Sequence, residues 1–387
     1  MTYNSCPENN DCYKIKPRMV YLDNLKALLM IFVVMMHAAC TYSGIGSWAY
    51  IEHRSYGKLT YYFFLFYQSL SQAYFMALFF LISAYFIPRS LEKKGVKKFV
   101  QDRLYRLGLP TLIFIAIIHP LWMILAQPNF DLVGSFYRGI ISLKIFAWTG
   151  PMWFAVILLI SSILFAFVQK PLAAATRSFT FAFNVKNILL LTLIIAGGAF
   201  VLRCYFPFGT SFFNFQLGNF SAYIILFTLG TVAGQKQLFE KISYKKAKLC
   251  LLAAFGIGLP LWCLIVGFWI PFGENIETMQ FLGGWNIPAF AYALWESFFC
   301  VTFSIALLGI FREKFNSQNR LQVFMSANAF GVYVFHPLIL TAVTVMMAPA
   351  DWPPLFKFLI AVVVAVPLSF LGAALIRIVK PLRILFS

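Results

Sequence analysis

The chain has 387 residues, of which 61% are hydrophobic and 19% aromatic, while only 11% are charged. A soluble protein of this length has no use for so much apolar surface, so the excess is expected to face lipid. The net charge of +18 would suggest nucleic-acid binding, but the basic residues lie in short segments between apolar runs. No continuous basic face is left to follow a phosphate backbone, which argues against that class of partner.

Ten apolar runs follow one another along the chain. We expect a membrane-spanning helix in each, at residues 19–42, 62–87, 108–127, 151–169, 187–203, 216–235, 247–270, 285–311, 324–346 and 354–380. Each run is long enough to cross a hydrocarbon core of about 30 Å as a helix. Pro120, Pro260, Pro337 and Pro367 fall inside these runs and are expected to kink helices rather than end them. The sequence therefore predicts an all-α polytopic membrane protein.

Most of the 31 Lys and Arg residues lie in alternate connecting segments, namely 1–18, 88–107, 170–186, 236–248, 312–320 and 377–383. Basic loops are retained in the cytoplasm. We therefore expect both termini inside the cell and the protein in the cytoplasmic (inner) membrane. The predicted organisation is an N-terminal tail (1–18, too polar for a signal peptide), one transmembrane domain (19–380) and a C-terminal tail (381–387).

Lys26 and His37 lie within the first span, eleven residues apart. Eleven helical steps return to nearly the same face, so both side chains lie on one stripe, about 16 Å apart along the axis. Ionisable groups at this depth usually face a bundle interior or a watered cavity. A neutral imidazole there can act as a general base, or it can simply bond to a neighbouring helix. Lys26 has a plainer alternative as the ion-pair partner of Asp23.

Arg103 and Arg106 lie directly before the third span, next to a run of lysines. Arginines three apart on a helix present two guanidinium groups on one side, which suits bidentate phosphate binding. The alternative is a cluster that sets membrane topology and touches anionic lipid.

Later spans contain a second set of polar residues. Glu296 lies deep in the eighth span, and His336 lies near the middle of the ninth, three residues after Tyr333. A carboxylate at membrane depth needs a partner, for which His37, Lys26 and His336 are the candidates. Glu296 would then orient or charge-balance His37, or form a purely structural salt bridge.

Trp153 opens the fourth span at the end opposite the basic segments. Tryptophan at that depth is usually an interface anchor, and its functional alternative is to stack on a sugar ring. No HExxH, Walker loop or GxSxG motif occurs, which argues against the commonest metalloprotease, nucleotidase and serine-hydrolase classes. Cys6 and Cys12 lack a CxxC pattern and a nearby histidine, so we expect no metal site.

Several stretches together resemble the acyltransferase-3 family of integral membrane O-acyltransferases, over nearly the whole chain. Lys26 to His37 is similar to the family's Arg/Lys-x10-His motif, and Arg103–Arg106 to its RxxR element. Residues 79–85 resemble its second-span signature, although Ala84 replaces the more usual glycine. Residues 152–154 resemble its WF element, and residues 331–336 its late Tyr-x-x-His stretch. The opening Tyr-Leu-Asp (21–23) and the Trp-Glu-Ser of 295–297 are most similar to the glucan-modifying branch.

The resemblance implies an acyl-CoA co-substrate, usually acetyl-CoA, that enters from the cytoplasm, and no further cofactor. The acceptor is expected to be a hydroxyl of a carbohydrate or lipid-linked cell-envelope glycan. Arg103 and Arg106 would bind the CoA phosphates and His37 would deprotonate the acceptor, with an acyl-histidine intermediate as the other possibility. Lys26 would stabilise charge along that path.

Glu296 completes the catalytic candidates, while Trp153, Tyr333 and His336 are expected to contact the acceptor or to be structural. The sequence does not decide whether the donor is acetyl-CoA or succinyl-CoA. A proton-coupled secondary transporter is the alternative from another class, because buried Lys, His and Glu side chains suit a carrier. Such a carrier should show similarly interrupted spans in its two halves, and the sequence has none.

Overall fold

The computed structural model describes residues 18–178, 180–269 and 280–386. Within these ranges the long helical stretches are α1 (Val20–Ser43), α2 (Lys58–Tyr85), α3 to α5 (Ile87–Ala126), α7 (Trp153–Ala175), α8 (Val185–Tyr205), α9 (Phe220–Lys236), α10 and α11 (Tyr244–Trp269), α12 (Ile287–Lys314), α13 (Arg320–Met346) and α14 (Pro354–Ile376). Two shorter helices are α6 (Leu132–Ile141) and α15 (Lys380–Leu385). Ten helical stretches in the described ranges are long and apolar enough to cross a membrane, which confirms the all-α polytopic prediction.

Prolines lie inside these helical stretches without ending them, as predicted. The third stretch continues from α3 (Ile87–Arg103) through α4 (Leu109–Ile113) to α5 (His119–Ala126), with a π-helical turn before Pro110 and another before Pro120. A third π-turn, Ala254–Gly258, precedes Pro260 between α10 and α11. A proline lacks an N–H and crowds the carbonyl four residues earlier, so a widened turn at that point relieves the clash.

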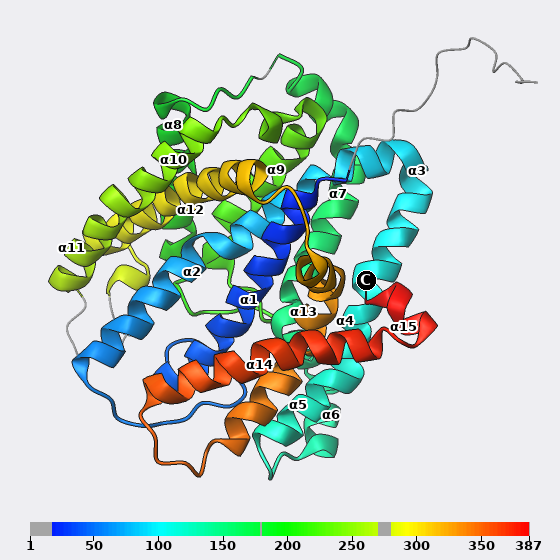
Figure 1. Cartoon of the computed structure of the whole chain (residues 1–387), viewed down its shortest axis with the longest axis vertical. Helices are drawn as coiled ribbons and strands as arrows, with labels where there is room; N and C mark the ends of the chain where they lie inside the picture. Colours follow the sequence, from blue (N-terminus) through cyan, green and yellow to red (C-terminus); the bar gives the residue numbers. More distant parts are fainter. Residues whose placement is uncertain (1–17, 179, 270–279, 387) are drawn as a thin grey trace, which may run out of the picture.

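Helix α1 lies inside the bundle, where it contacts α2, α12, α13 and α14 (Figure 1). Helices α13 and α14 make extensive contact, as do α2 and α9. The α2–α9 contact depends on small residues, since a Cβ on Gly230 would overlap the Leu81 carbonyl oxygen and one on Gly234 that of Tyr85. Close backbone approach through glycine is the usual way in which membrane helices pack tightly.

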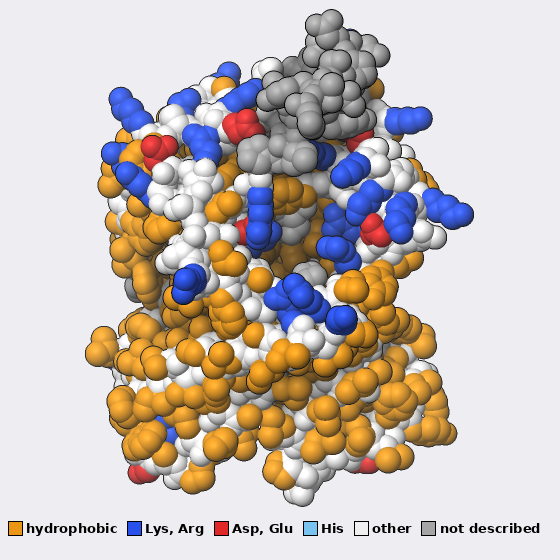
Figure 2. Space-filling view, turned by 45° about the vertical axis from the view of Figure 1, so that its right-hand side comes forward, with side chains coloured by type: hydrophobic (Ala, Val, Ile, Leu, Met, Phe, Trp, Pro, Cys, Tyr) orange, Lys and Arg blue, Asp and Glu red, His pale blue; other side chains and the backbone are white. Residues whose placement is uncertain are grey.

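Within the described chain the basic segments lie together at one end of the bundle, which we call the basic end. Arg312 at the end of α12 donates to the carbonyls of Phe239 and Ile242, and Lys236 donates to the carbonyl of Arg177. Figure 2 shows Lys and Arg side chains gathered around a hollow with hydrophobic walls, above a broad hydrophobic surface with few charges. That surface matches the many exposed large apolar residues of the outer helices and is suited to contact with lipid.

The last helix, α15, packs against the bundle, although residues 381–387 were expected to form a tail. Leu385 is 5% exposed and Phe386 is 2% exposed, and the Phe386 ring lies 5.0 Å from that of Phe335 on α13. The end of the described chain is therefore part of the folded domain.

Candidate functional site

The side chain of His37 lies on α1 a little less than two turns before the end of the helix at Ser43. It is partly exposed, whereas its neighbours Val34 and Ala38 are buried. Helix α13 lies beside α1 at this level and brings a second histidine to the first. The pair is therefore built from two spans that are about 300 residues apart in the sequence.

His336 on α13 is fully buried, and its Nε2 lies 3.1 Å from Nδ1 of His37. Its own Nδ1 lies 3.0 Å from the carbonyl oxygens of Val332 and of Tyr333. The two imidazole rings are nearly parallel, with centroids 5.1 Å apart. A hydrogen-bonded histidine pair thus stands at membrane depth, and sequence spacing alone gave no sign of the pairing.

The hydrogen bonds determine which nitrogens carry protons in the neutral pair. Carbonyl oxygens only accept, so Nδ1 of His336 must be the donor and its Nε2 is left as an acceptor. Nδ1 of His37 must then donate to His336. Nε2 of His37 keeps its lone pair and is the basic nitrogen of the pair. A partly exposed imidazole with a fixed, unprotonated Nε2 is the arrangement that a general base requires.

Trp48 covers the histidine pair and Trp122 packs against Trp48, and sequence analysis missed both tryptophans. Trp48 stacks on His37 with ring centroids 4.1 Å apart and an angle of 21°, and it also contacts Trp122 of α5 at 4.6 Å. Nε1 of Trp122 donates to Thr341 on α13 at 2.8 Å. Trp48 lies in the irregular segment between α1 and α2, where no periodicity or motif marks a residue as functional.

Ion pairs hold the segment that carries Trp48. Glu52 accepts from the fully buried Lys357 of α14 at 2.7 Å, and Arg54 pairs with Asp351 at 2.6 Å. The backbone N–H of Glu52 also donates to the carbonyl of Thr41 at the end of α1. These contacts fix the Trp48 ring over His37 from the end of the bundle opposite the basic segments.

Tyr333, one turn before His336, connects the pair to Trp153. The Tyr333 hydroxyl donates to the carbonyl of Pro151 at 2.5 Å and accepts from the backbone N–H of Ala155 at 3.3 Å. It thereby holds the start of α7 against α13. The Trp153 ring lies 5.6 Å from Tyr223 of α9 and is partly exposed.

Lys26, Arg103 and Arg106 lie apart from the histidines, toward the basic end. Lys26 pairs with Asp23 at 2.9 Å, as its plainer interpretation predicted, and its ammonium lies 5.5 Å above the Phe86 ring. The Arg103 guanidinium lies 5.0 Å from the Phe99 ring centroid, and Arg106 is exposed. Neither arginine forms an ion pair with a carboxylate of the described chain, because Asp102 pairs with Lys94 and Lys98.

The ion-pair partner of Glu296 differs from the three that the sequence suggested. None of the three candidate partners reaches it; instead Arg203 of α8 donates to its Oε2 at 2.5 Å. Arg203 is 1% exposed and is also bonded to the side chain of Asn219 and the carbonyl of Gly218. The predicted fifth span ends at Arg203, but α8 extends through this residue to Tyr205. The longer helix buries the guanidinium opposite the carboxylate, so the partner assignment for Glu296 was wrong.

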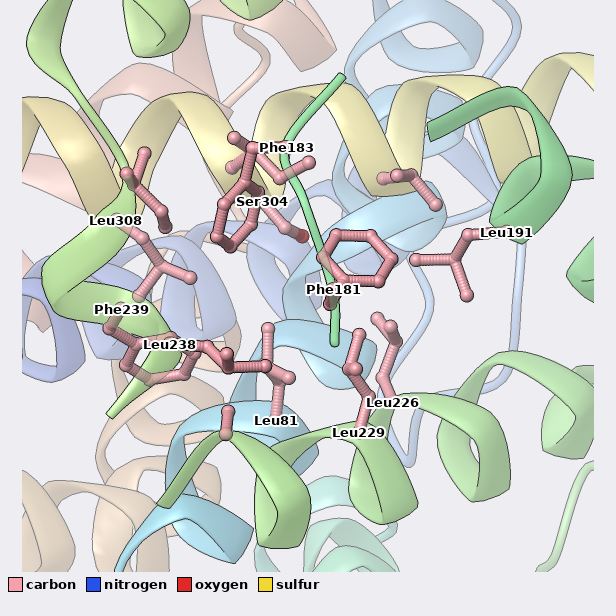
Figure 3. A pocket seen from close by; sticks show the side chains of 14 residues that line it. Leu81, Phe181, Phe183, Leu191, Leu226, Leu229, Leu238, Phe239, Ser304 and Leu308 are labelled. Atoms are coloured by element: carbon pink, nitrogen blue, oxygen red, sulfur yellow. The ribbon is translucent and has the colours of Figure 1, made fainter. Parts of the chain in front are cut away.

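Two cavities accompany these features. One lies around the Arg203–Glu296 pair, where polar side chains such as those of Gln72 and Ser297 share the wall with apolar ones. The other, between α2, α9 and α12, has an almost wholly apolar lining to which Leu81, Leu226 and Phe181 contribute (Figure 3). Neither of these two cavities is lined by a histidine.

Comparison with known proteins gives the family of the chain. A family model described as an acyltransferase domain, that of acyltransferase family 3, matches residues 19–374. No curated protein and no solved structure matches the sequence. The matched residues reach from the start of α1 to the last turn of α14 and include both histidines. The chain therefore belongs to the acyltransferase-3 family and is a multi-pass membrane acyltransferase.

Proposed function

We propose that the protein transfers an acetyl or succinyl group from acyl-CoA to a hydroxyl of a carbohydrate or another cell-envelope glycan. The basic end would face the cytoplasm, and the opposite end would face the acceptor. The observation that carries this proposal is the His37–His336 pair, in which the hydrogen bonds leave Nε2 of the partly exposed His37 unprotonated. The resemblance to the glucan-modifying branch supports the choice of a glycan acceptor.

In the proposed step, Nε2 of His37 removes the proton of the acceptor hydroxyl as its oxygen attacks the thioester carbonyl. The C–S bond then breaks, and the leaving thiolate takes the proton from the imidazolium to give free CoA and the ester. His336 accepts the Nδ1 proton of His37 in a hydrogen bond throughout and so holds the ring in the reactive tautomer. It acts as a positioning residue.

Basic residues would guide the donor from the cytoplasm. Arg103 and Arg106 are free of carboxylate partners in the described chain and are proposed to bind CoA phosphates. Lys26 lies on α1 between the basic end and His37, and its ammonium would stabilise the negative charge of the donor along this path. Trp153 is proposed as a stacking surface for the acceptor sugar.

The site residues favour this function over a proton-coupled carrier. A carrier would need Lys26 and Glu296 to change partners during transport. Both are held in local ion pairs, with Asp23 and Arg203. We therefore assign Glu296 a structural role in place of the catalytic role expected from the sequence.

Labelled acyl donors test the proposal. Membranes that contain the protein are incubated with radiolabelled acetyl-CoA or succinyl-CoA, and the envelope glycans are then fractionated. The proposal predicts base-labile label on one glycan from one donor, and none with His37→Ala membranes. Wild-type membranes that transfer label from neither donor, while a known membrane acyltransferase in the same assay does, would contradict it.

A further inference from the structure

The described chain continues past the family match, and its last segment contains three basic residues, Arg377, Lys380 and Arg383. Buried Leu385 and Phe386 anchor α15 against α13, so these residues occupy fixed positions. Surface lysines and arginines that only set topology need no such anchoring.

Arg377 has the features of an anion-binding arginine. Its Nη1 donates to Oδ1 of Asn328 at 2.7 Å, and Asn328 is itself 3% exposed and bonded to the Phe324 carbonyl at 2.7 Å. This holds the guanidinium in one orientation. Its Nε is buried without a hydrogen-bond partner, which is costly unless a ligand supplies an acceptor.

Arg383 adds a second positive charge beside the first. Burial, and to a lesser extent the charge of Arg383, lower the pKa of Arg377. Within the described ranges, no carboxylate forms an ion pair with Arg377, Lys380 or Arg383, although other arginines of the chain do have such partners. Two neighbouring arginines without a compensating acid are the usual basis of a phosphate site.

The position along α13 relates this pair to the histidines. Asn328 comes eight residues after Arg320 at the mouth of the bundle and eight residues before His336, which places it about 12 Å from each along the axis. The pantetheine arm of CoA has about as many chain bonds as a four-residue peptide, which extends to roughly 13–14 Å. A phosphate at Arg377 would therefore leave the thioester within reach of His37.

We propose that Arg377 and Arg383 bind a phosphate of the nucleotide part of acyl-CoA and form a second phosphate position beside that of Arg103 and Arg106. The hydrophobic walls of the hollow at the basic end would then enclose the pantetheine arm (Figure 2). The inference rests on the proposed function, because it takes acyl-CoA as the donor. An anionic lipid headgroup has the same phosphate chemistry, so the test must separate the two sources.

The test compares two donors with one protein in neutral-lipid nanodiscs. Acetyl-CoA contains the nucleotide phosphates, whereas S-acetylpantetheine lacks every phosphate but keeps the same arm and thioester. For Arg377→Ala/Arg383→Ala we expect KM for acetyl-CoA to rise roughly 10–100-fold and KM for S-acetylpantetheine to stay within about twofold. The matched control is Lys245→Ala/Lys246→Ala, which removes two exposed charges from α10 and should change neither KM.

Three outcomes would overturn the inference. An unchanged KM for acetyl-CoA would mean that the arginines only set topology, and an equal rise with both donors would mean that they support the fold. An effect seen only when anionic lipid is present would assign the arginines to lipid. If the double variant does not fold, Arg383→Ala alone is informative, since Arg383 is exposed.

A separate measurement keeps this result distinct from that of the proposed function. Calorimetric titration with CoA itself needs no turnover. Weaker binding of CoA by the arginine variant supports the phosphate site even if the acceptor assay fails, while unchanged binding of CoA contradicts it.

Discussion

The hydrogen bond between His37 and His336 gives the second histidine a role that can be measured. His336→Ala removes the acceptor for Nδ1 of His37 and frees the ring to adopt the wrong tautomer. We expect kcat to fall about 10–100-fold with little change in KM, as is typical when a residue that orients a reacting group is lost. His336→Gln keeps an acceptor oxygen and should recover part of the activity. A fall in folded yield with unchanged kcat per folded molecule would instead show that His336 only supports the fold.

Sequence reasoning found both histidines but not their contact. The Lys26–His37 spacing places the two on one face of α1, yet only the packing of α1 against α13 brings His336 to His37. That packing depends on many contacts between distant spans. Trp48 was missed for a related reason, because an irregular segment has no period from which to infer which way a side chain points.

At the scale of elements, the α2–α9 contact gives a stability prediction. Gly234→Ala would push a Cβ into the Tyr85 carbonyl and force the two helices apart, at a cost of about 1–3 kcal/mol. Gly197→Ala on α8 is the matched control, because nothing lies within 4 Å of a Cβ there. Thermal unfolding in detergent should show a lower Tm for the first variant only. Equal Tm values would mean that α2 and α9 are not in close contact.

The Arg203–Glu296 pair, which joins α8 to α12, separates a structural role from a catalytic one. Glu296→Gln leaves a guanidinium that is 1% exposed without a countercharge, and breaking a buried pair in this way typically costs about 3–5 kcal/mol. We expect a marked loss of thermal stability, while the folded fraction keeps its kcat. A stable variant with a much reduced kcat would return Glu296 to the reacting site.

The ten spans could be predicted because their apolar runs are long and separated by charges, whereas the structure of the connections could not. The basic segment 88–107 is helical for most of its length and continues into the third span, with Gly95 at a φ of 71° interrupting it. Its alternation of lysines with apolar residues gives only a weak helical pattern. Long apolar runs are therefore a reliable guide to spans and a poor guide to the helices that extend beyond them.

For the whole molecule, the charge distribution predicts that the basic end faces the cytoplasm. A cysteine introduced at exposed Lys245 should be protected from an impermeant maleimide in intact cells and labelled after lysis. A cysteine at Lys144, in the connection between α6 and α7, should be labelled in intact cells. The parent chain provides the background, since its native cysteines include the exposed Cys263. The opposite labelling pattern would mean that the basic end faces the outside of the cell.

The central claim is that His37 is the general base that deprotonates the acceptor hydroxyl for attack on the acyl-CoA thioester. Its most direct test is the rate of CoA release from acetyl- or succinyl-CoA, with the acceptor present, by purified wild-type protein and by His37→Ala. The control is Met36→Ala, which alters the adjacent position of α1. The account predicts that His37→Ala lowers kcat by about 10²–10⁴-fold while Tm and CoA binding are kept. A His37→Ala protein that turns over at the wild-type rate would contradict it.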